Sequence, residues 1–367
     1  MIPNITVPTL MVDEQKVRRN IDRMVARAQR HHLPLRPHFK THQSDHIGQW
    51  FRDSGVSTIT VSSLRMAEYF AEAGWNDITN AFPVNILEMD RIQRLSQVVR
   101  LHLLVENPEA IRALDSHLTH EVGIFIKINS GNNRTGLLPE NTKAIDTLLA
   151  LLAEAPKLTF KGFLAHAGHT YQARGKEEIA RIHYETMRKL EPMITHYRER
   201  YPDLIFSYGD TPSCSTMEDF GLANELRPGN FVFYDLTQAT IGSCELNDIA
   251  VAMACPVVAK HPERNDVVVY GGGIHFSKDQ LVRHGEVTYG LPVRWTRNGW
   301  DVIDDGRSHM HKLSQEHGIL HVSDELFADI QIGEIVGVVP VHSCMTADLM
   351  KAYQTLEGRE LGMLTYV

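Results

Sequence analysis

Lys40, in the N-terminal part of the chain, lies in a segment that would suit covalent chemistry. It follows the strand candidate at residues 35–39 and lies within residues 36–42, whose sequence is RPHFKTH. A lysine amine that is partly removed from water gives up its proton readily and can form a Schiff base with an aldehyde cofactor. A surface lysine that simply follows a strand is the alternative, and this segment alone leaves both open.

Two later segments could hold an anion or take part in acid–base chemistry. Residues 129–136, NSGNNRTG, form a glycine-rich turn that delivers Arg134, whose guanidinium suits an anion or a phenolate. Residues 166–171, HAGHTY, place His166 and Tyr171 at the end of another apolar run. These two side chains could be ligands, acid–base groups or packing residues, and the sequence leaves that choice open.

Two further loops offer small residues with free backbone N–H groups. Their candidate residues are Tyr208 and Thr211 in residues 208–213, YGDTPS, and Arg227, Gly229 and Asn230 in residues 227–230, RPGN. At the seventh and eighth strands of a barrel, such loops form a recurrent phosphate site. No Gly-x-Gly-x-x-Gly motif opens a helix after a predicted strand, which argues against a dinucleotide.

The C-terminal part of the chain contains a possible metal pair, His342 and Cys344. In a strand these two side chains would point to the same face. An imidazole and a thiolate at this spacing can hold Zn²⁺ if other ligands or water complete the shell. A half-buried cysteine beside a packing histidine is the alternative.

Alternating apolar runs and helical periodicity predict the scaffold that positions these residues. After a strand at residues 9–12 and a helix at residues 14–31, the predicted strands are 35–39, 58–62, 77–80, 101–105, 123–129, 158–166, 204–208 and 225–234. The predicted helices between them are 46–52, 64–73, 85–98, 108–118, 140–153, 176–200 and 213–220. Eight such units favour a closed (β/α)₈ barrel over an open doubly wound sheet.

After about residue 247, strand-like runs joined by turns replace the alternation of strands and helices. This change predicts a second, β-rich domain. Its expected strands are residues 249–260, 266–270, 287–295, 313–322 and 335–341, joined by glycine-containing turns. We therefore expect a barrel domain over residues 1–246 and a β-rich domain over residues 247–367, and residues 1–12 are a candidate for an added strand of the second domain.

Composition narrows the class of protein further. The 367 residues carry a net charge of −8 with no long run of either sign, which argues against a nucleic-acid partner. No stretch is apolar enough for a membrane helix, and the N-terminus lacks the pattern of a signal peptide. The four cysteines are scattered singly, which is typical of a reducing compartment. We expect a cytoplasmic enzyme that acts on a small molecule.

Taken together, the segments resemble the fold-type III enzymes that use pyridoxal phosphate (PLP), the alanine racemase-like barrels. The resemblance covers nearly the whole chain and is closest to the D-serine dehydratase and D-threonine aldolase branch. Its most specific motif, Arg-Pro-His-x-Lys-Thr-His, implies that Lys40 holds the cofactor. The family often has aspartate where this chain has Asn129.

The resemblance also implies roles for the other candidates. Arg134 would contact the phenolic oxygen of PLP, and Arg227 the pyridine nitrogen. The remaining cofactor-binding residues would be His166, Tyr171, Tyr208, Thr211, Gly229 and Asn230. In this branch a His-x-Cys or His-x-Asp pair binds a divalent metal beside PLP. His342 and Cys344 are the form typical of the dehydratases, which implies Zn²⁺ or another divalent ion such as Mn²⁺.

The activity implied is that of a lyase acting on a β-hydroxy D-amino acid. Conversion of D-serine to pyruvate and ammonia is favoured, with an aldolase or dehydratase of D-threonine or 3-hydroxy-D-aspartate as the alternative. An amino-acid racemase or a PLP-carrier protein is more remote, and a zinc hydrolase without PLP would leave Lys40 unexplained. The family also implies a homodimer.

Overall fold

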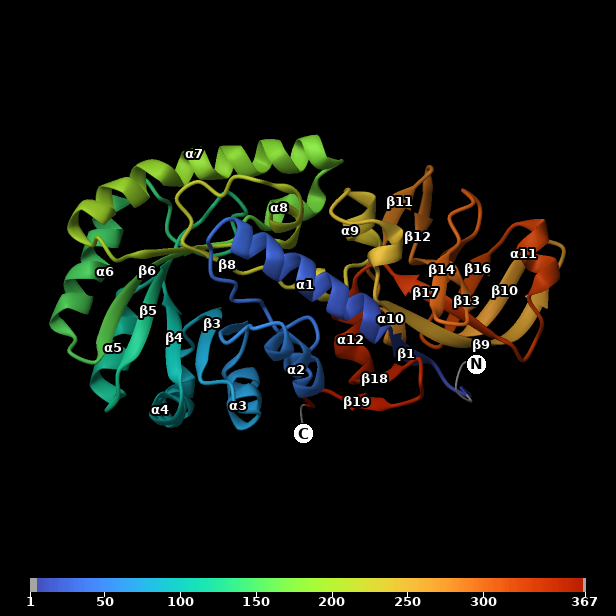
Figure 1. The fold of residues 1–367 in the computed structure, drawn as a ribbon, viewed down its shortest axis with the longest axis horizontal. Coiled ribbons are helices and arrows are strands. Elements are labelled where there is room, and N and C mark those ends of the chain that lie inside the picture. Colours follow the sequence, from blue (N-terminus) through green and yellow to red (C-terminus); the bar gives the residue numbers. More distant parts are fainter. Residues whose placement is uncertain (1–4, 366–367) are drawn as a thin grey trace. The chain divides into compact units, whose positions relative to one another are not determined.

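The computed structural model describes residues 5–365, which form two compact units (Figure 1). We call Arg23–Lys40 together with Phe51–Gly229 the barrel unit. Residues up to Asp22, Thr41–Trp50 and those from Asn230 onward are the β unit. Each unit is built from separate stretches of the chain, and α1 (Glu14–Arg30) and α2 (Asp45–Asp53) each contribute residues to both.

A parallel sheet of seven strands, in sequence order, forms the centre of the barrel unit. The strands are β2 (Ile59–Val61), β3 (Asp77–Pro83), β4 (Arg100–Val105), β5 (Val122–Lys127), β6 (Leu158–Ala165), β7 (Ile205–Tyr208) and β8 (Glu225–Leu226). The most central strands read as nearly continuous apolar runs because both faces of a parallel sheet are covered.

Residues 35–39 take the eighth place in the ring, as isolated bridges rather than a regular strand. On one side the backbone N–H groups of Arg36 and His38 donate to the carbonyls of Leu226 and Pro228, each at 2.8 Å. On the other side Phe39 N–H donates to the Thr60 carbonyl, also at 2.8 Å. These bonds join the two ends of the sheet, so the predicted eight-stranded barrel architecture is confirmed.

Helices follow the strands and cover the outside of the sheet (Figure 1). They are α3 (Leu64–Glu72), α4 (Met89–Val98), α5 (Pro108–His117), α6 (Thr142–Glu154), α7 (Lys176–Arg200) and α8 (Thr211–Thr216), with short 3₁₀ turns at Ile86–Glu88 and Gly168–Gln172. The starts of several are set by side-chain caps. Ser63, for example, accepts the Met66 N–H, and Asn107 accepts the Ala110 N–H with Pro108 in the first turn.

Phe39, immediately before Lys40, is a buried anchor of the barrel unit. Its ring is fully buried and lies 4.9–5.0 Å, centroid to centroid, from the rings of Phe51, Phe70 and Trp75. Aromatic pairs at such distances add to the burial of apolar area. The backbone on which Lys40 sits is therefore held by close packing.

We expect Phe39→Ala to lower the free energy of unfolding by about 3–5 kcal/mol, because it leaves a large cavity in a packed core. Chemical denaturation followed by tryptophan fluorescence would measure the change. Phe82, whose side chain is 56% exposed, provides the matched control. A similar loss of stability in Phe82→Ala would show that the effect does not come from the packing around Phe39.

The β unit contains a ten-stranded sheet. Its strands are β1 (Thr9–Val12), β9 (Val251–His261), β10 (Asp266–Tyr270), β13 (Gly290–Thr296), β14 (Gly299–Val302), β15 (His309–Leu313), β16 (His317–His321), β17 (Ile335–Pro340), β18 (Ala352–Thr355) and β19 (Glu360–Gly362). A hairpin of β11 (Leu281–Arg283) and β12 (Glu286–Thr288) lies apart from it. The short helices are α9 (Leu236–Thr240), α10 (Gly273–Phe276), α11 (Asp324–Asp329) and α12 (Ser343–Met350), with 3₁₀ turns at Asn230–Val232 and Leu246–Asp248.

Strand β1 lies between β9, to which it is antiparallel, and β18, to which it is parallel. The N-terminal segment therefore does add a strand to the second unit. The boundary itself differs from the expected one, because the β unit begins at Asn230 rather than after residue 246. Residues 230–249 belong there because Ala250 N–H donates to the Phe233 carbonyl and Thr237 N–H to that of Val341.

Besides residues 35–39, three predicted strands differ from the structure. The expected strand 313–322 is divided into the end of β15, a turn at residues 314–316 and β16. The expected strand 225–234 is regular only over Glu225–Leu226, after which Pro228 interrupts donation and Asn230–Val232 forms a 3₁₀ turn. The expected strand 287–295 is divided between β12 and β13 at Tyr289.

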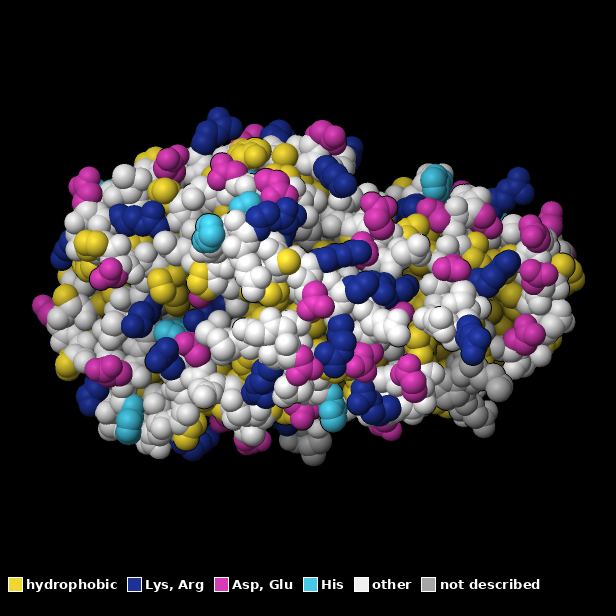
Figure 2. Space-filling model, viewed as in Figure 1, with side chains coloured by type: hydrophobic (Ala, Val, Ile, Leu, Met, Phe, Trp, Pro, Cys, Tyr) yellow, Lys and Arg dark blue, Asp and Glu magenta, His cyan; other side chains and the backbone are white. Residues whose placement is uncertain are grey.

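The surface carries interspersed charges and no single-sign region on the face drawn in Figure 2. Among residues 5–365, no helix is long and apolar enough to cross a membrane.

Candidate active site

Lys40 lies in the turn that follows the bridging segment of the barrel unit. Its side chain is exposed, and its backbone N–H lies 3.3 Å from Nδ1 of His38, which accepts the bond. Fixing the His38 ring in this way places an imidazole next to the lysine at the C-terminal ends of the strands. That end of a barrel is where the chemistry of such folds takes place.

Positive charge surrounds the two histidines at these strand ends. Burial is the main cause that lowers the pKa of His38 well below its usual value, and the charges of Lys40 and Arg227 lower it further. Burial also lowers the pKa of His166 far below its usual value, assisted by Lys40 and Lys127. Both rings are therefore neutral at neutral pH. His166 is oriented by the Gly209 carbonyl, 2.7 Å from its Nδ1.

Lys127, at the end of β5, is a buried cation in the same region. Only 5% of it is exposed, and its Nζ donates to the Ile128 carbonyl at 3.1 Å. Burial, followed by the charges of Arg227 and Arg134, lowers its pKa to about 7. An anion bound nearby would favour the charged form of this lysine.

The turn that carries Arg134 is organised by the side chain of Asn129. Its Oδ1 accepts the backbone N–H groups of Gly131 at 2.9 Å and of Asn133 at 3.2 Å. An aspartate could accept the same two bonds, so the departure of Asn129 from the family pattern leaves the shape of the turn intact. Arg134 itself is exposed, and its charge acts on His38, which places it among the same cationic groups.

Two loops that were predicted to hold a phosphate contact each other in the barrel unit. Thr211 N–H donates to the Tyr171 hydroxyl at 3.2 Å, and Gly229 N–H donates to Thr211 Oγ1 at 3.4 Å. Gly209 allows these loops to approach closely, because a Cβ there would lie 2.6 Å from the Arg227 backbone nitrogen. These contacts bring Tyr171, Thr211 and Gly229 together.

Two other predicted cofactor contacts have their side chains engaged elsewhere. The buried Tyr208 hydroxyl lies 3.2 Å from Nδ1 of His183 and donates to Ser213 Oγ at 3.4 Å. The Asn230 amide, in the β unit, donates to Asp235 and Ser343 at 2.7 and 3.0 Å. A cofactor contact by either side chain stays a prediction, and Asn230 has its backbone N–H to offer instead.

Arg227 is held at the end of β8 with 4% of its surface exposed. Its Nε donates to Ser207 Oγ at 2.6 Å, and its Nη2 donates to the Ala165 carbonyl at 2.7 Å. Burial lowers the pKa of this guanidinium to about 10, so it remains a cation at neutral pH. Within residues 5–365 its Nη1 makes no hydrogen bond to the protein, which leaves that nitrogen available to a ligand.

In the β unit, His342 and Cys344 are close together, but not in the expected way. Strand β17 ends at Pro340, His342 caps α12, and Cys344 lies in the first turn of that helix. The expectation that both residues point from one face of a strand is therefore wrong. A turn and a helix start bring the side chains within hydrogen-bonding distance of one another instead.

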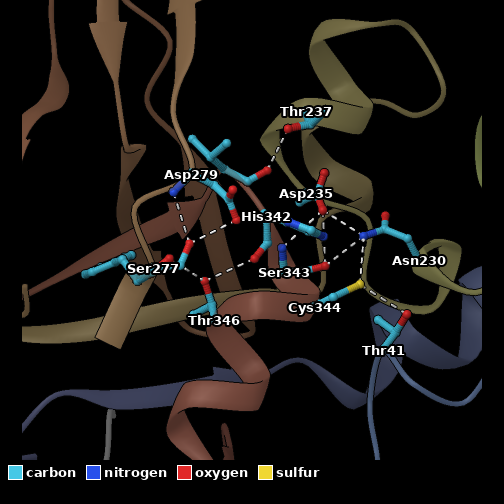
Figure 3. Close-up of polar contacts among 12 residues, drawn as sticks. Thr41, Asn230, Asp235, Thr237, Ser277, Asp279, His342, Ser343, Cys344 and Thr346 are labelled. Atoms are coloured by element: carbon cyan, nitrogen blue, oxygen red, sulfur yellow. Dashed lines mark hydrogen bonds and ion pairs between the residues drawn. The ribbon is translucent and has the colours of Figure 1, made fainter. Parts of the chain in front are cut away.

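Acidic and polar neighbours hold this pair (Figure 3). Asp279 Oδ2 lies 3.0 Å from His342 Nδ1, and Thr41 Oγ1 lies 3.3 Å from Cys344 Sγ. Burial alone would lower the pKa of His342, but the hydrogen bond and charge of Cys344, with the charges of Asp235 and Asp279, raise it to about 10. His342 therefore holds its proton beside Cys344, and a metal ion that bound both side chains would displace it.

The residues present fit both expected groups. PLP carries a phosphate, a phenolic oxygen and a ring nitrogen, and the barrel unit offers an amine, the Thr211 hydroxyl and the cations Arg134 and Arg227. The His342–Cys344 pair suits a divalent ion, because a carboxylate on the outer ring nitrogen leaves Nε2 as the ligand atom. In the part of the chain that the structure describes, no three His, Cys, Asp or Glu side chains gather around one point, so water or substrate would complete the shell.

Three residues of the site were not predicted from the sequence. Lys127 lies near the end of the predicted strand 123–129 and Thr41 lies in the lysine motif, so inspection of strand ends could have found both. Asp279 lies in a loop far from His342 in the sequence, and only the tertiary structure brings their side chains together.

Two family descriptions match the chain. Residues 12–236 match the alanine racemase N-terminal domain, and residues 250–356 match the putative serine dehydratase domain. The first match covers more than half of the chain.

Relatives of known activity match along nearly the whole length. The D-serine dehydratase of Dictyostelium discoideum is 27% identical over 97% of this chain and 95% of its own. The 3-hydroxy-D-aspartate aldolase of Paracoccus denitrificans is 25% identical over 95% of this chain and 88% of its own. The solved D-threo-3-hydroxyaspartate dehydratase from Delftia sp. HT23 superposes with a TM-score of 0.90, at 24% identity and 99% coverage of both chains. A cysteine-to-alanine variant of that dehydratase is described in a metal-free form. Because the first family match spans residues 12–236, this chain belongs to the alanine racemase N-terminal domain family of fold-type III PLP enzymes.

Proposed function

We propose that the chain is a PLP- and divalent-metal-dependent lyase that converts D-serine into pyruvate and ammonia. The observation that carries this proposal is the His342–Cys344 pair with Asp279 on the outer ring nitrogen. A racemase or a PLP carrier has no use for such a pair. The whole-length similarity to dehydratases and an aldolase supports the same class.

Lys40 would hold the cofactor through its side-chain amine. When bound, PLP withdraws electrons from the Cα atom of the amino acid joined to it, which weakens the bonds at that carbon. Once its amine is free, Lys40 would take the Cα proton. His38 and His166 are neutral, so they would border the site without adding charge.

Other residues of the barrel unit would fix the position of the cofactor. The Thr211 hydroxyl, which accepts the Gly229 N–H, would donate its proton to the phosphate, while Tyr171 accepts the Thr211 N–H and orients that loop. Arg134 would meet the phenolic oxygen, and the unengaged Nη1 of Arg227 would face the ring nitrogen.

His342 and Cys344 would hold the divalent ion, which supplies Lewis acidity for the departure of the β-hydroxyl group. Loss of the Cα proton and of hydroxide from D-serine releases one water. Hydrolysis of the resulting enamine consumes one water and gives pyruvate and ammonia. The competing retro-aldol reaction instead removes the hydroxyl proton and breaks the Cα–Cβ bond, giving glycine and an aldehyde. The cysteine at the second ligand position favours elimination.

An assay of products tests this proposal. Purified protein, supplied with PLP and Zn²⁺ or Mn²⁺, is incubated with D-serine, D-threonine and D-threo-3-hydroxyaspartate, and with the L-enantiomers as controls. We expect keto acid and ammonia in equal amounts from the D-substrates, and none from the L-enantiomers. If glycine and an aldehyde were the main products, the activity would be that of an aldolase and not of a dehydratase. Racemised substrate without either product would overturn the proposed lyase.

We expect Asp279→Asn to weaken metal binding by about 10- to 100-fold, the usual cost of losing a carboxylate that orients a ligating histidine. Competition between the protein and a metallochromic dye would measure the affinity. Asp304→Asn is the control, because Asp304 is an acid that pairs with Arg283 outside the metal pair. Unchanged affinity in Asp279→Asn would mean that this carboxylate does not orient His342.

From the family resemblance we also propose a homodimer that acts on a small-molecule D-amino acid, and from the singly scattered cysteines we propose a cytoplasmic location. Sedimentation of the purified holoenzyme would test the dimer directly.

A further inference from the structure

A buried chain of alternating charges lies behind Arg227 in the barrel unit. Ser207 Oγ accepts from Arg227 Nε at 2.6 Å and lies 2.6 Å from Oε1 of Glu225. The second Glu225 oxygen accepts from Arg36 Nε at 2.7 Å, and Arg36 Nη1 donates to Asp77 at 2.5 Å. Ser207, Glu225, Arg36 and Arg227 are each less than 9% exposed.

We propose that Glu225, acting through the Ser207 hydroxyl, is a positioning residue that holds Arg227 against the ring nitrogen of PLP and keeps that nitrogen unprotonated. This inference rests on the proposed function, because it assumes that PLP binds at Lys40. It goes beyond it by assigning a role to Ser207 and Glu225, which would not touch the cofactor themselves.

The chemistry of the three groups fixes the direction of each hydrogen bond. The guanidinium of Arg227 can only donate, and an ionised carboxylate can only accept. Ser207 has one proton, so its O–H must donate to Glu225 while its lone pair accepts from Arg227 Nε. These two bonds hold the Ser207 hydroxyl in one orientation, so the position of the Glu225 carboxylate determines where Arg227 Nε lies.

This arrangement also determines which part of Arg227 can reach a ligand. Nε is held by Ser207, and Nη2 is held by the carbonyls of Ala165 and Ser207. The planar group is therefore fixed at two of its three nitrogens, and Nη1 is presented in one direction. A fixed cation that donates a hydrogen bond to a ring nitrogen lowers the proton affinity of that nitrogen.

Glu225 is also the acid that balances the charge of Arg227. The other ionisable groups that act on Arg227, or on which it acts, are Cys214 on α8, Arg36, Lys127 on β5 and His38. Burial lowers the pKa of Arg227, and Glu225 is the acid that opposes this effect. Arg36 pairs with both Glu225 and Asp77, so the row from Arg227 to Asp77 alternates in sign.

The test reads the ring nitrogen directly and does not depend on turnover. Wild-type protein and variants are reconstituted with PLP that carries an isotopically labelled ring nitrogen, and its NMR chemical shift is followed against pH. We expect the wild-type nitrogen to stay unprotonated across neutral pH. In Ser207→Ala we expect its pKa to rise by about one unit or more, toward the 1–3 units that a charge at contact distance produces.

Two further variants test the path from Glu225. Glu225→Asp keeps the acid near Arg36 but shortens the side chain, so it cannot reach both Arg36 and Ser207, and we expect a shift in the same direction. In the double variant, Ser207→Ala with Glu225→Asp, the pKa of the ring nitrogen should rise no further than in Ser207→Ala alone. The reason is that loss of the Ser207 hydroxyl already disconnects Glu225 from Arg227. Thr60→Val is the matched control: Thr60 is a buried hydroxyl that donates to the Arg36 carbonyl, outside this row.

The outcomes separate the inference from the proposed function. If the protein does not bind PLP, the proposed function fails together with the inference. If PLP binds and the wild-type nitrogen is protonated, or if Ser207→Ala leaves its pKa unchanged, the role of Ser207 and Glu225 is wrong while the lyase proposal stands. A shift in Glu225→Asp without one in Ser207→Ala would also overturn the inference, as would an equal shift in Thr60→Val.

Discussion

Replacement of Lys40 by alanine is expected to lower the turnover of D-serine by more than about 10⁴-fold. Loss of a positioned proton-transfer group alone costs about 10²- to 10⁴-fold. Lys40 would also attach the cofactor, so its removal affects binding and chemistry together. The variant should fold normally, because the exposed Lys40 side chain is not part of the packed core around Phe39.

Steady-state release of pyruvate measures this effect, and borohydride reduction followed by peptide mapping identifies the attachment site. Lys143→Ala is the control, since Lys143 is an exposed lysine on α6. We expect the reduced cofactor on the peptide that contains Lys40 in wild-type protein and in the control. If the cofactor were attached to another lysine, or if turnover survived in Lys40→Ala, the assignment of Lys40 as the PLP-binding lysine would be wrong.

The second large effect is expected at the metal pair. Cys344→Ala and His342→Ala should each lower turnover by about 10²-fold or more, because Lewis acidity at a leaving group is worth several kcal/mol. The metal affinity of each variant should also fall by more than the 10- to 100-fold expected for Asp279→Asn, because a metal ligand is removed rather than a group that orients one. Elemental analysis of dialysed protein, together with pyruvate release, measures both quantities.

Cys244→Ala is the matched control, because Cys244 is a free, half-buried cysteine that is not part of the pair. Treatment with a chelator should reproduce the loss of activity in wild-type protein, and added Zn²⁺ or Mn²⁺ should restore it. Turnover that resists chelation, or metal content that is unchanged in both variants, would contradict the assignment of His342 and Cys344.

The barrel unit was largely predictable from the sequence, because its strands are buried on both faces and its helices have one apolar side. The predicted limits of the long helix 176–200 agree with α7, and most of the others agree within two residues. The prediction was less successful at residues 225–234. That apolar run is buried, yet its burial comes from a turn and loop around Pro228 rather than from a continuous strand.

In the β unit, short strands with mixed composition gave little signal. Strand β14 has four residues, and β11 and β19 have three each, so neither periodicity nor an apolar run distinguishes them from loops. The spacing of His342 and Cys344 correctly predicted that the two side chains are close together. The predicted geometry was wrong, because the start of a helix rather than a strand brings them together.

The groups that support the site were not predictable, because they come from distant parts of the chain. Asp279 is 63 residues from His342, and Glu225 is 189 residues from Arg36. A single sequence shows which side chains could do chemistry at strand ends. It does not show which buried acid will face which base, since that depends on how the strands pair.

The place of β1 in its sheet has a consequence for the synthesis of this protein. Its residues Thr9–Val12 are made well before their partners, which are Val251–Ala254 on one edge and Gln354–Thr355 on the other. At about 5–20 residues per second, one edge of the strand waits for tens of seconds on the nascent chain. A largely apolar strand with an open edge is a template for aggregation, so we expect a ribosome-associated chaperone to protect this segment until its partners are made.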